Sequence, residues 1–314
     1  MVNVWFEFQF PFVKESELGE TIPSLVSLLV GVIVTDESGI LVSRIFTVTV
    51  PPCSVVCVEL EDGIAPKDKD EARDKGLALF EQPQADDGIE RIVRINCLRT
   101  RFGVDDVRMV LGMATPPPAL MLPKVLSPEE IIWLDDLMTE QGLSTRLHII
   151  IETNAALEVA YDIARSSERI DALFFGGVDM AADLRCKNAW EPLLYARSRV
   201  VHAAAAAGID AIDVPYLDLE DLDGMAEEVR LAAELGFAGK GSVHPKQIPI
   251  LNSIFTPDEA SIAYAQKVID AFSEANTGLV LVDGKLIEKP VLRQMERLVT
   301  IADRTTGRGN TQKN

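Results

Sequence analysis

The chain has 314 residues, 47% of them hydrophobic and 25% charged, with a formal net charge of −19. This length and composition are typical of a folded protein with a large core and exclude a mainly disordered chain. The negative charge argues against nucleic acid or an anionic membrane surface as the main partner. No apolar run is long and uninterrupted enough to predict a membrane span. The four cysteines form no CxxC pair, which predicts reduced, buried thiols in a cytoplasmic protein.

The first 54 residues have no regular pattern. Residues 5–12 are aromatic and strand-like, residues 22–34 are apolar without clean periodicity, and residues 45–50 fit a strand ended by Pro51 and Pro52. We therefore expect an atypical N-terminal segment over residues 1–54.

From residue 55 onward, apolar strands alternate with amphipathic helices. The strands are centred near residues 58, 94, 121, 149, 174, 212 and 242, and the helices are expected over 67–80, 104–113, 127–141, 155–165, 192–207 and 219–235. Such alternation predicts a parallel sheet with right-handed crossovers. Within the helix at 127–141, Ser127 and Glu130 have the spacing of a capping box.

An eighth strand from the N-terminal segment would close these seven into a (β/α)8 barrel, the TIM-barrel fold. The alternative is an open doubly wound sheet, which usually carries a glycine-rich phosphate loop, and the sequence contains neither GxGxxG nor GxxxxGK[ST]. We predict a TIM barrel over residues 55–255 and a C-terminal helical extension over residues 256–314.

Two carboxylates follow neighbouring buried strands. Glu152 ends the apolar run 147–151, and Asp179 follows the run 172–175 after a Gly-Gly turn. If the strands are neighbours in a parallel sheet, both acids face one crevice. Mg2+ is commonly held by one or two carboxylates, with water and substrate completing its shell. A helix cap or a salt bridge would explain either acid alone, but the matching positions favour a metal site.

Arg94 lies inside the apolar strand over residues 92–96. A buried arginine needs an acidic partner, and Glu59 or Glu61 on the neighbouring strand are the candidates. The pair is either a structural ion pair or an anion clamp, and both roles are compatible. Glu59, Glu61 and Asp62 lie within four positions at a strand end, and at least one of them would orient Arg94 or a metal-bound water, unless all three are solvated strand-end acids.

Three further residues stand where strands end. Lys124, next to Pro123, would neutralise a phosphate or carboxylate, or it is a surface lysine. The Gly176-Gly177 turn would let the backbone approach a ligand, with Gly177 as the candidate contact, or it is only a tight turn. His244 is a candidate hydrogen-bond partner for substrate or a core histidine, and the other two histidines are interpreted as structural.

Several motifs, taken in order, resemble the citrate lyase β-subunit-like enzymes of the HpcH/HpaI aldolase superfamily, which include malyl-CoA and citramalyl-CoA lyases. The motifs are ELEDGIAPKDKDEAR at 59–73, VRIN at 93–96, LPKV at 122–125, IIETNAAL at 150–157, ALFFGGVDMAADL at 172–184, GKGSVHPKQIPILNSIFTP at 239–257 and VDGKLIEKPVLRQMERL at 282–298. The resemblance covers residues 55–302. No single motif is specific, but their combination is.

The resemblance implies a TIM barrel, Mg2+ and reversible carbon–carbon cleavage of a 3-hydroxyacyl-CoA, such as malyl-CoA or citramalyl-CoA, to an acyl-CoA and a 2-oxo acid (glyoxylate or pyruvate). It places the metal on Glu152 and Asp179 and the contact to the substrate carbonyl or enolate on Arg94. It also implies a homotrimer or homohexamer, because the family's C-terminal acid/base residue acts in a neighbouring subunit. That residue is usually Asp, and the aligned residue here is the longer Glu288.

Two other functions remain open. A malyl-CoA thioesterase or a malate-synthase-like enzyme needs almost the same residues. A catalytically inactive structural or regulatory subunit is the second alternative, favoured by Glu288 and by the unusual front end.

The front end departs from the family, which opens with a strand, a helix and then the LED strand. Only residues 51–54 separate a candidate strand at 44–50 from the next one, whereas a parallel crossover needs a dozen or more residues. Residues 22–35 supply the first strand, or the barrel opening is rebuilt, or the first 54 residues are not the ancestral sequence. We expect this front end to dock poorly.

Overall fold

The computed structural model describes residues 4–5, 28–35, 41–48, 55–84, 89–275 and 278–305. They fall into two compact units, residues 2–251 and residues 252–314. Each unit has its own hydrophobic core.

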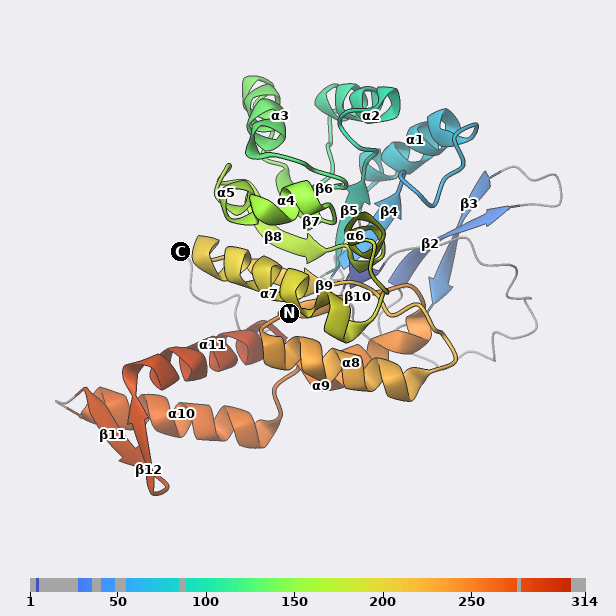
Figure 1. Ribbon diagram of the computed structural model, residues 1–314. Helices are drawn as coiled ribbons and strands as arrows, with labels where there is room; N and C mark the ends of the chain where they lie inside the picture. The colour runs from blue at the N-terminus through green and yellow to red at the C-terminus, as the bar shows by residue number, and fades with distance from the viewer. Residues whose placement is uncertain are drawn as a thin grey trace. The chain divides into compact units, whose positions relative to one another are not determined.

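The first unit is a closed barrel of parallel strands in the order β1-β10-β9-β8-β7-β6-β5-β4 (Figure 1). The strands are β1 (Val4–Trp5), β4 (Val55–Glu59), β5 (Glu90–Arg94), β6 (Ala119–Leu122), β7 (Arg146–Ile151), β8 (Ile170–Phe175), β9 (Asp210–Asp213) and β10 (Gly239–Ser242). The predicted TIM-barrel fold is confirmed, and all seven strands expected after residue 55 are present.

Side chains that alternate along the strands fill two separate layers, as the two-residue period of a strand requires. One layer, inside the barrel, includes Met121, Ile150 and Phe174. The other joins the outer faces of the strands to the surrounding helices and includes Leu120 and Ile149. The sheet is therefore covered on both sides, and polar strand-end residues can gather only at its rim.

Helices follow the strands around the barrel. They are α1 (Lys69–Ala78), α2 (Arg101–Leu111), α3 (Pro128–Glu140), α4 (Asn154–Glu158), α5 (Ala160–Ala164), α6 (Gly177–Leu184), α7 (Trp190–Ala207), α8 (Leu222–Leu235) and α9 (Ile248–Phe255), with short 3-10 turns η2 (Leu79–Glu81) and η3 (Pro245–Gln247). The single helix expected over 155–165 is instead two short helices, because Val159 between them leaves the helical region, with φ −110° and ψ 19°.

The capping box predicted at Ser127 is not formed. The Ser127 side chain makes no cap bond to the backbone of α3. Glu130 instead accepts a hydrogen bond from Arg99, with 2.5 Å between Nη1 and Oε1. A charge-assisted bond to a guanidinium is stronger than one to a neutral backbone N–H, so Arg99 takes this carboxylate away from the helix start.

The N-terminal segment supplies the closing strand in an unexpected way. The two residues of β1 pair with β10 on one side and β4 on the other. Strands β2 (Leu28–Thr35) and β3 (Leu41–Val48) form an antiparallel hairpin outside the barrel sheet. The proposal that residues 22–35 supply the first strand is therefore wrong for the described residues 28–35. Strand β3 follows β2 after a short connection, which allows antiparallel but not parallel pairing.

Among the described residues before Val55 there is no helix, so the barrel opening is rebuilt there relative to the expected strand–helix unit. The expectation of a poorly docked front end concerns side chains that lie outside the described residues.

The second unit consists of helices α10 (Glu259–Glu274) and α11 (Lys289–Thr305) and the hairpin of β11 (Leu279–Val282) and β12 (Lys285–Glu288) (Figure 1). The helical extension was predicted, but the hairpin was not. Asp283 and Gly284 join its strands with φ values of 49° and 74°, both left-handed as in a type I′ turn. One hairpin face packs its valines and Ile287 against the helices.

None of the helices in the described part of the chain is long and apolar enough to cross a membrane. Three cysteines are described, and none is in a disulfide. Cys57 and Cys97 are buried as predicted, whereas Cys186 is half-buried, and Cys53 lies outside the described residues.

Candidate active site

The two carboxylates predicted to bind metal lie at the carboxyl ends of adjacent strands. Glu152 directly follows β7 and is buried, at 4% exposure. Asp179 lies in the first turn of α6, which follows β8, and its side chain is 43% exposed. β7 and β8 pair in parallel along their length, so both acids stand at the same rim of the barrel.

The electrostatics of Glu152 show that several site residues come together. Burial, reinforced by the negative charge of Asp179, raises the pKa of Glu152 to about 8. Arg94 and a hydrogen bond from the backbone N–H of Lys124 act in the opposite direction, and Glu61 adds a further raising effect. The Lys124 N–H lies 2.6 Å from Glu152 Oε1.

This donor set fits a hard divalent cation. Two carboxylates that repel each other at this rim would each be stabilised by a shared positive charge, and oxygen is the ligand atom that Mg2+ prefers. No cluster of three or more His, Cys, Asp or Glu side chains arranged to hold a metal occurs among the described residues. Mg2+ held by one or two carboxylates usually completes its shell with water and substrate.

Gly176 makes room for Glu152, a role that the sequence analysis missed. A Cβ at this glycine would lie 2.4 Å from Glu152 Cβ and 2.5 Å from Glu152 Oε2. No real side chain tolerates such contacts, so glycine is required here by the buried carboxylate. The Gly-Gly pair is the sequence signal for this role.

Gly177, the predicted ligand contact, is the buried first residue of α6. A Cβ there would lie 3.1 Å from both Phe175 Cε1 and Val214 Cγ1, so close packing of the turn explains this glycine. Contact between Gly177 and substrate stays a prediction.

Arg94 is buried and bound by the acids that the sequence suggested. Its Nε donates to Glu59 Oε2 at 2.7 Å, and its Nη1 lies 3.7 Å from Glu61 Oε2. Glu59 is at the end of β4, which pairs with β5, and its other oxygen accepts the Glu61 backbone N–H at 2.5 Å. Burial raises the pKa of Glu59, and the charge of Arg94 limits that rise.

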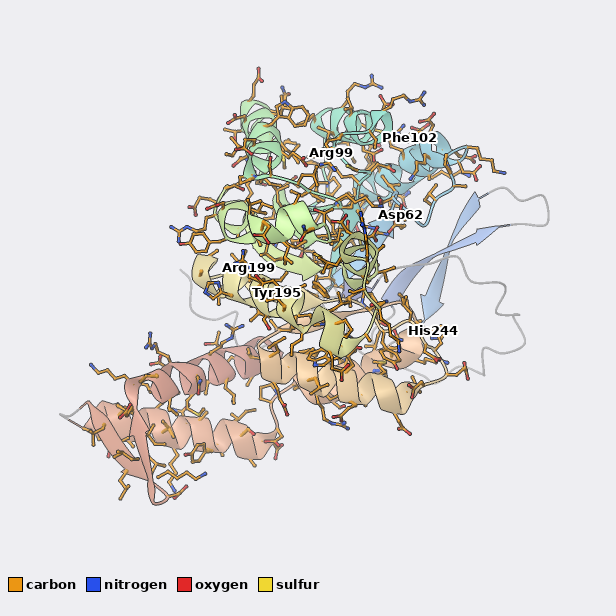
Figure 2. The ribbon with its side chains drawn as sticks, in the orientation of Figure 1. Asp62, Arg99, Phe102, Tyr195, Arg199 and His244 are labelled. Atoms are coloured by element: carbon orange, nitrogen blue, oxygen red, sulfur yellow. The ribbon has the colours of Figure 1, made fainter. Side chains whose placement is uncertain are left out.

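Lys124 reaches into the site and does not extend freely from the surface. Its Nζ donates to Glu61 Oε1 at 2.5 Å and to Asp62 Oδ2 at 2.6 Å, and it lies 4.0 Å from Asp179 Oδ1. Burial would lower the pKa of Lys124, but the bonds to Asp62 and Glu61 outweigh it, so that its pKa is raised. This ammonium thus links the acids after β4 to Asp179 across the rim; Figure 2 labels Asp62.

The buried Lys69 of α1 supports the same loop and was not predicted. Its ammonium donates to the carbonyls of Leu60 (3.0 Å) and Glu61 (2.8 Å) and to Asn96 Oδ1 (2.5 Å). Asn96 is held in turn by Asp106 of α2. No sequence pattern distinguishes Lys69, because it stands in a run of alternating lysines and aspartates typical of a solvated helix start.

Other strand-end residues serve the scaffold. His244 accepts the Lys246 backbone N–H at 3.1 Å through Nδ1 and so caps η3. Asp213 of β9 is buried between Arg197 (3.0 Å) and Lys240 (2.5 Å). His148, interpreted as structural, lies inside the barrel with Nε2 2.8 Å from Asp171 Oδ1.

Glu288 does not belong to this cluster of the barrel unit. It is the last residue of β12 in the second unit, where it is exposed. Its role in a neighbouring subunit therefore stays a prediction.

A (β/α)8 barrel with a carboxylate pair, a buried arginine and an anchored lysine at the carboxyl ends of its strands is the architecture of a barrel enzyme that acts on an anionic substrate. Comparison with known proteins agrees with this class. The HpcH/HpaI aldolase/citrate lyase family matches residues 45–245, and the chain belongs to that family.

Curated relatives cover most of the chain. Mitochondrial citramalyl-CoA lyase from Rattus norvegicus is 34% identical over 277 residues, which span 81% of each protein. Citrate lyase subunit beta from Haemophilus influenzae is 31% identical over 249 residues, which span 76% of this chain and 84% of that protein.

A solved structure shares the fold. The protein CitE from Mycobacterium tuberculosis, in complex with magnesium, acetoacetate and coenzyme A, is 29% identical and superimposes with a TM-score of 0.65, covering 80% of this chain and 90% of that one.

Proposed function

We propose that the protein is a Mg2+-dependent carbon–carbon lyase. It would cleave a 3-hydroxyacyl-CoA such as malyl-CoA or citramalyl-CoA to an acyl-CoA and a 2-oxo acid, glyoxylate or pyruvate. The observation that carries the proposal is that Glu152 and Asp179 follow adjacent parallel strands, with Glu152 within electrostatic range of both Asp179 and Arg94. The lyases and the magnesium- and coenzyme-A-bound protein among its relatives support it.

The carboxylates of Glu152 and Asp179 would hold Mg2+, which when bound acts as a Lewis acid toward the oxygens of the 2-oxo acid portion. Arg94 is fixed by Glu59, so its charge is already oriented before the reaction begins. It would stabilise the enolate oxygen of the departing acyl-CoA, where negative charge develops only as the bond breaks. Lys124 would add positive charge for a substrate carboxylate at the same rim.

We also propose that residues 256–314 complete the site of a neighbouring subunit in a homotrimer or homohexamer. Leu279, Leu281 and Leu286 are exposed on one face of the hairpin, at 48%, 71% and 60%. Glu288 pairs in register with Leu279, so its carboxylate belongs to the same face. An apolar face that carries one carboxylate suits docking on a second copy, where Glu288 would transfer the proton of the hydroxyl group.

A product assay tests the activity. The enzyme is incubated with malyl-CoA and citramalyl-CoA, with and without EDTA, and the products are separated. Glyoxylate or pyruvate, lost with EDTA and restored by added Mg2+, supports the lyase. Free malate with free CoA would indicate a thioesterase, and no turnover with any thioester would favour an inactive subunit.

A further inference from the structure

The loop between β6 and α3 contains a residue in an unfavourable backbone conformation. Lys124 has a φ of 53°, in the left-handed region that residues other than glycine and asparagine rarely adopt. Such a residue stays in place only where its surroundings hold it. In this loop both of its backbone polar groups are held.

The two backbone bonds of Lys124 point to different partners. Its N–H donates to Glu152 Oε1 at 2.6 Å. Its carbonyl accepts a hydrogen bond from Arg99 Nη2 at 2.7 Å, while Arg99 Nη1 donates to Glu130 of α3 at 2.5 Å. The Arg99 guanidinium therefore bonds both the Lys124 carbonyl and the Glu130 carboxylate, because its donors form a rigid fork.

The conformation of Lys124 has two consequences for the site. It sets the directions of the carbonyl and the side chain relative to the N–H, so that the N–H meets Glu152 while the ammonium reaches Glu61 and Asp62. A change in φ would rotate the Lys124 carbonyl and side chain relative to that N–H, so these bonds and the bond to Arg99 could not all be kept.

We infer that Arg99 is a positioning residue for the proposed metal and substrate site, acting through the backbone of Lys124. Arg99 bonds Glu130 and the Lys124 carbonyl, and not the carboxylates of Glu152 or Asp179. It lies in the loop between β5 and α2, and Figure 2 labels it near α2 and α3. Its bond to the Lys124 carbonyl keeps Lys124 in the left-handed conformation and thereby holds the Glu152 carboxylate and the Lys124 ammonium in place.

The test uses Arg99→Ala with Arg101→Ala as the matched control. Arg101, two residues along, is more exposed (71% against 40%) and pairs with Asp70 and Asp105 away from Lys124. Mn2+ serves as the probe, with affinity measured by electron paramagnetic resonance. Arg99→Ala is expected to weaken Mn2+ binding about tenfold, the scale of one lost charge-assisted hydrogen bond. Arg101→Ala is expected to bind as the unsubstituted protein does.

A second readout does not depend on the metal. In protein labelled with [15N]lysine, the amide of Lys124 should exchange faster with solvent in Arg99→Ala and stay protected in Arg101→Ala. Millimolar guanidinium ion should restore both readouts in Arg99→Ala, which a general loss of folding would not allow. Glu130→Gln, which keeps Arg99, should show a smaller change in the same direction.

The metal readout rests on the proposed function, and the amide readout does not. If the unsubstituted protein binds no Mn2+, the proposed metal site fails and the Lys124 amide alone decides about Arg99. Unchanged exchange of that amide in Arg99→Ala overturns the positioning role. Unchanged Mn2+ affinity in that variant, where the unsubstituted protein binds, overturns it as well.

Discussion

Gly176→Ala is the sharpest test of how Glu152 is held. The added Cβ would lie 2.4 Å from Glu152 Cβ, whereas carbon atoms pack at about 3.5–4.0 Å, so one of the two must move by at least about 1 Å. A shift of that size would stretch the 2.6 Å bond between the Lys124 N–H and Glu152 Oε1 beyond hydrogen-bonding range. We expect Mg2+ affinity to fall about 10- to 100-fold, since metal–ligand distances tolerate only about 0.2 Å. Overpacking should cost about 1–3 kcal/mol of unfolding free energy.

Isothermal titration with Mg2+ measures the affinity, and urea unfolding measures the stability. Gly112→Ala is the matched control, because Gly112 has an ordinary φ of −93° and a Cβ there would come no closer than 3.6 Å to its neighbours. It should leave both quantities nearly unchanged. Equal Mg2+ affinity and equal stability in Gly176→Ala and the unsubstituted protein would refute the idea that this glycine makes room for the carboxylate.

Three further predictions concern charge. Asp179→Asn should abolish Mg2+-dependent turnover while circular dichroism shows an intact fold, and retained activity would remove Asp179 from the metal site. The pKa of Glu152, raised to about 8 by burial and by Asp179, means that a bound cation displaces a proton below that pH. Calorimetric Mg2+ affinity should therefore increase with pH up to about 8 and then level off, with proton release below that pH, and a flat profile would contradict the shift. In the metal-free protein, protonation of this raised group contributes stability below pH about 4.5 that is lost as pH rises to about 8. Lys240→Met would leave Asp213 buried without this ammonium and should cost about 3–5 kcal/mol in urea unfolding. Lys75→Met, at a half-buried lysine paired with Glu71 on the surface of α1, should cost less than about 1 kcal/mol, and equal costs would argue against the buried pair.

The barrel strands and the charged residues at the site were the features most clearly predictable from the sequence, because both follow from burial. Strands covered on both faces are mainly apolar, so a charged residue within or directly after one stands out, as Arg94 and Glu152 do. In a (β/α)8 barrel the chemistry takes place at the carboxyl ends of the strands, so such residues gather at one rim.

Residues that act through the backbone were invisible to the same reasoning. The role of Gly176 depends on the distance between two strand ends, and that of Lys69 on two carbonyl groups, so neither is encoded in a side-chain pattern. The capping box at Ser127 failed for a related reason: Arg99, remote in sequence, competes for Glu130. Local motifs predict local bonds only where no stronger distant partner intervenes.

The two-residue strand β1 has a consequence for the order in which the barrel can be made. Val4 pairs with Val55 and also with Gly241, so the last joint of the ring connects the start of the barrel chain to its end. During synthesis β1 leaves the ribosome first, but its partner β10 follows only after the other strands. Until then the growing sheet has an open edge, the kind that pairs readily with other chains. Closure of the barrel is therefore a late folding step that joins distant parts of the chain, and it depends on the two-residue strand β1.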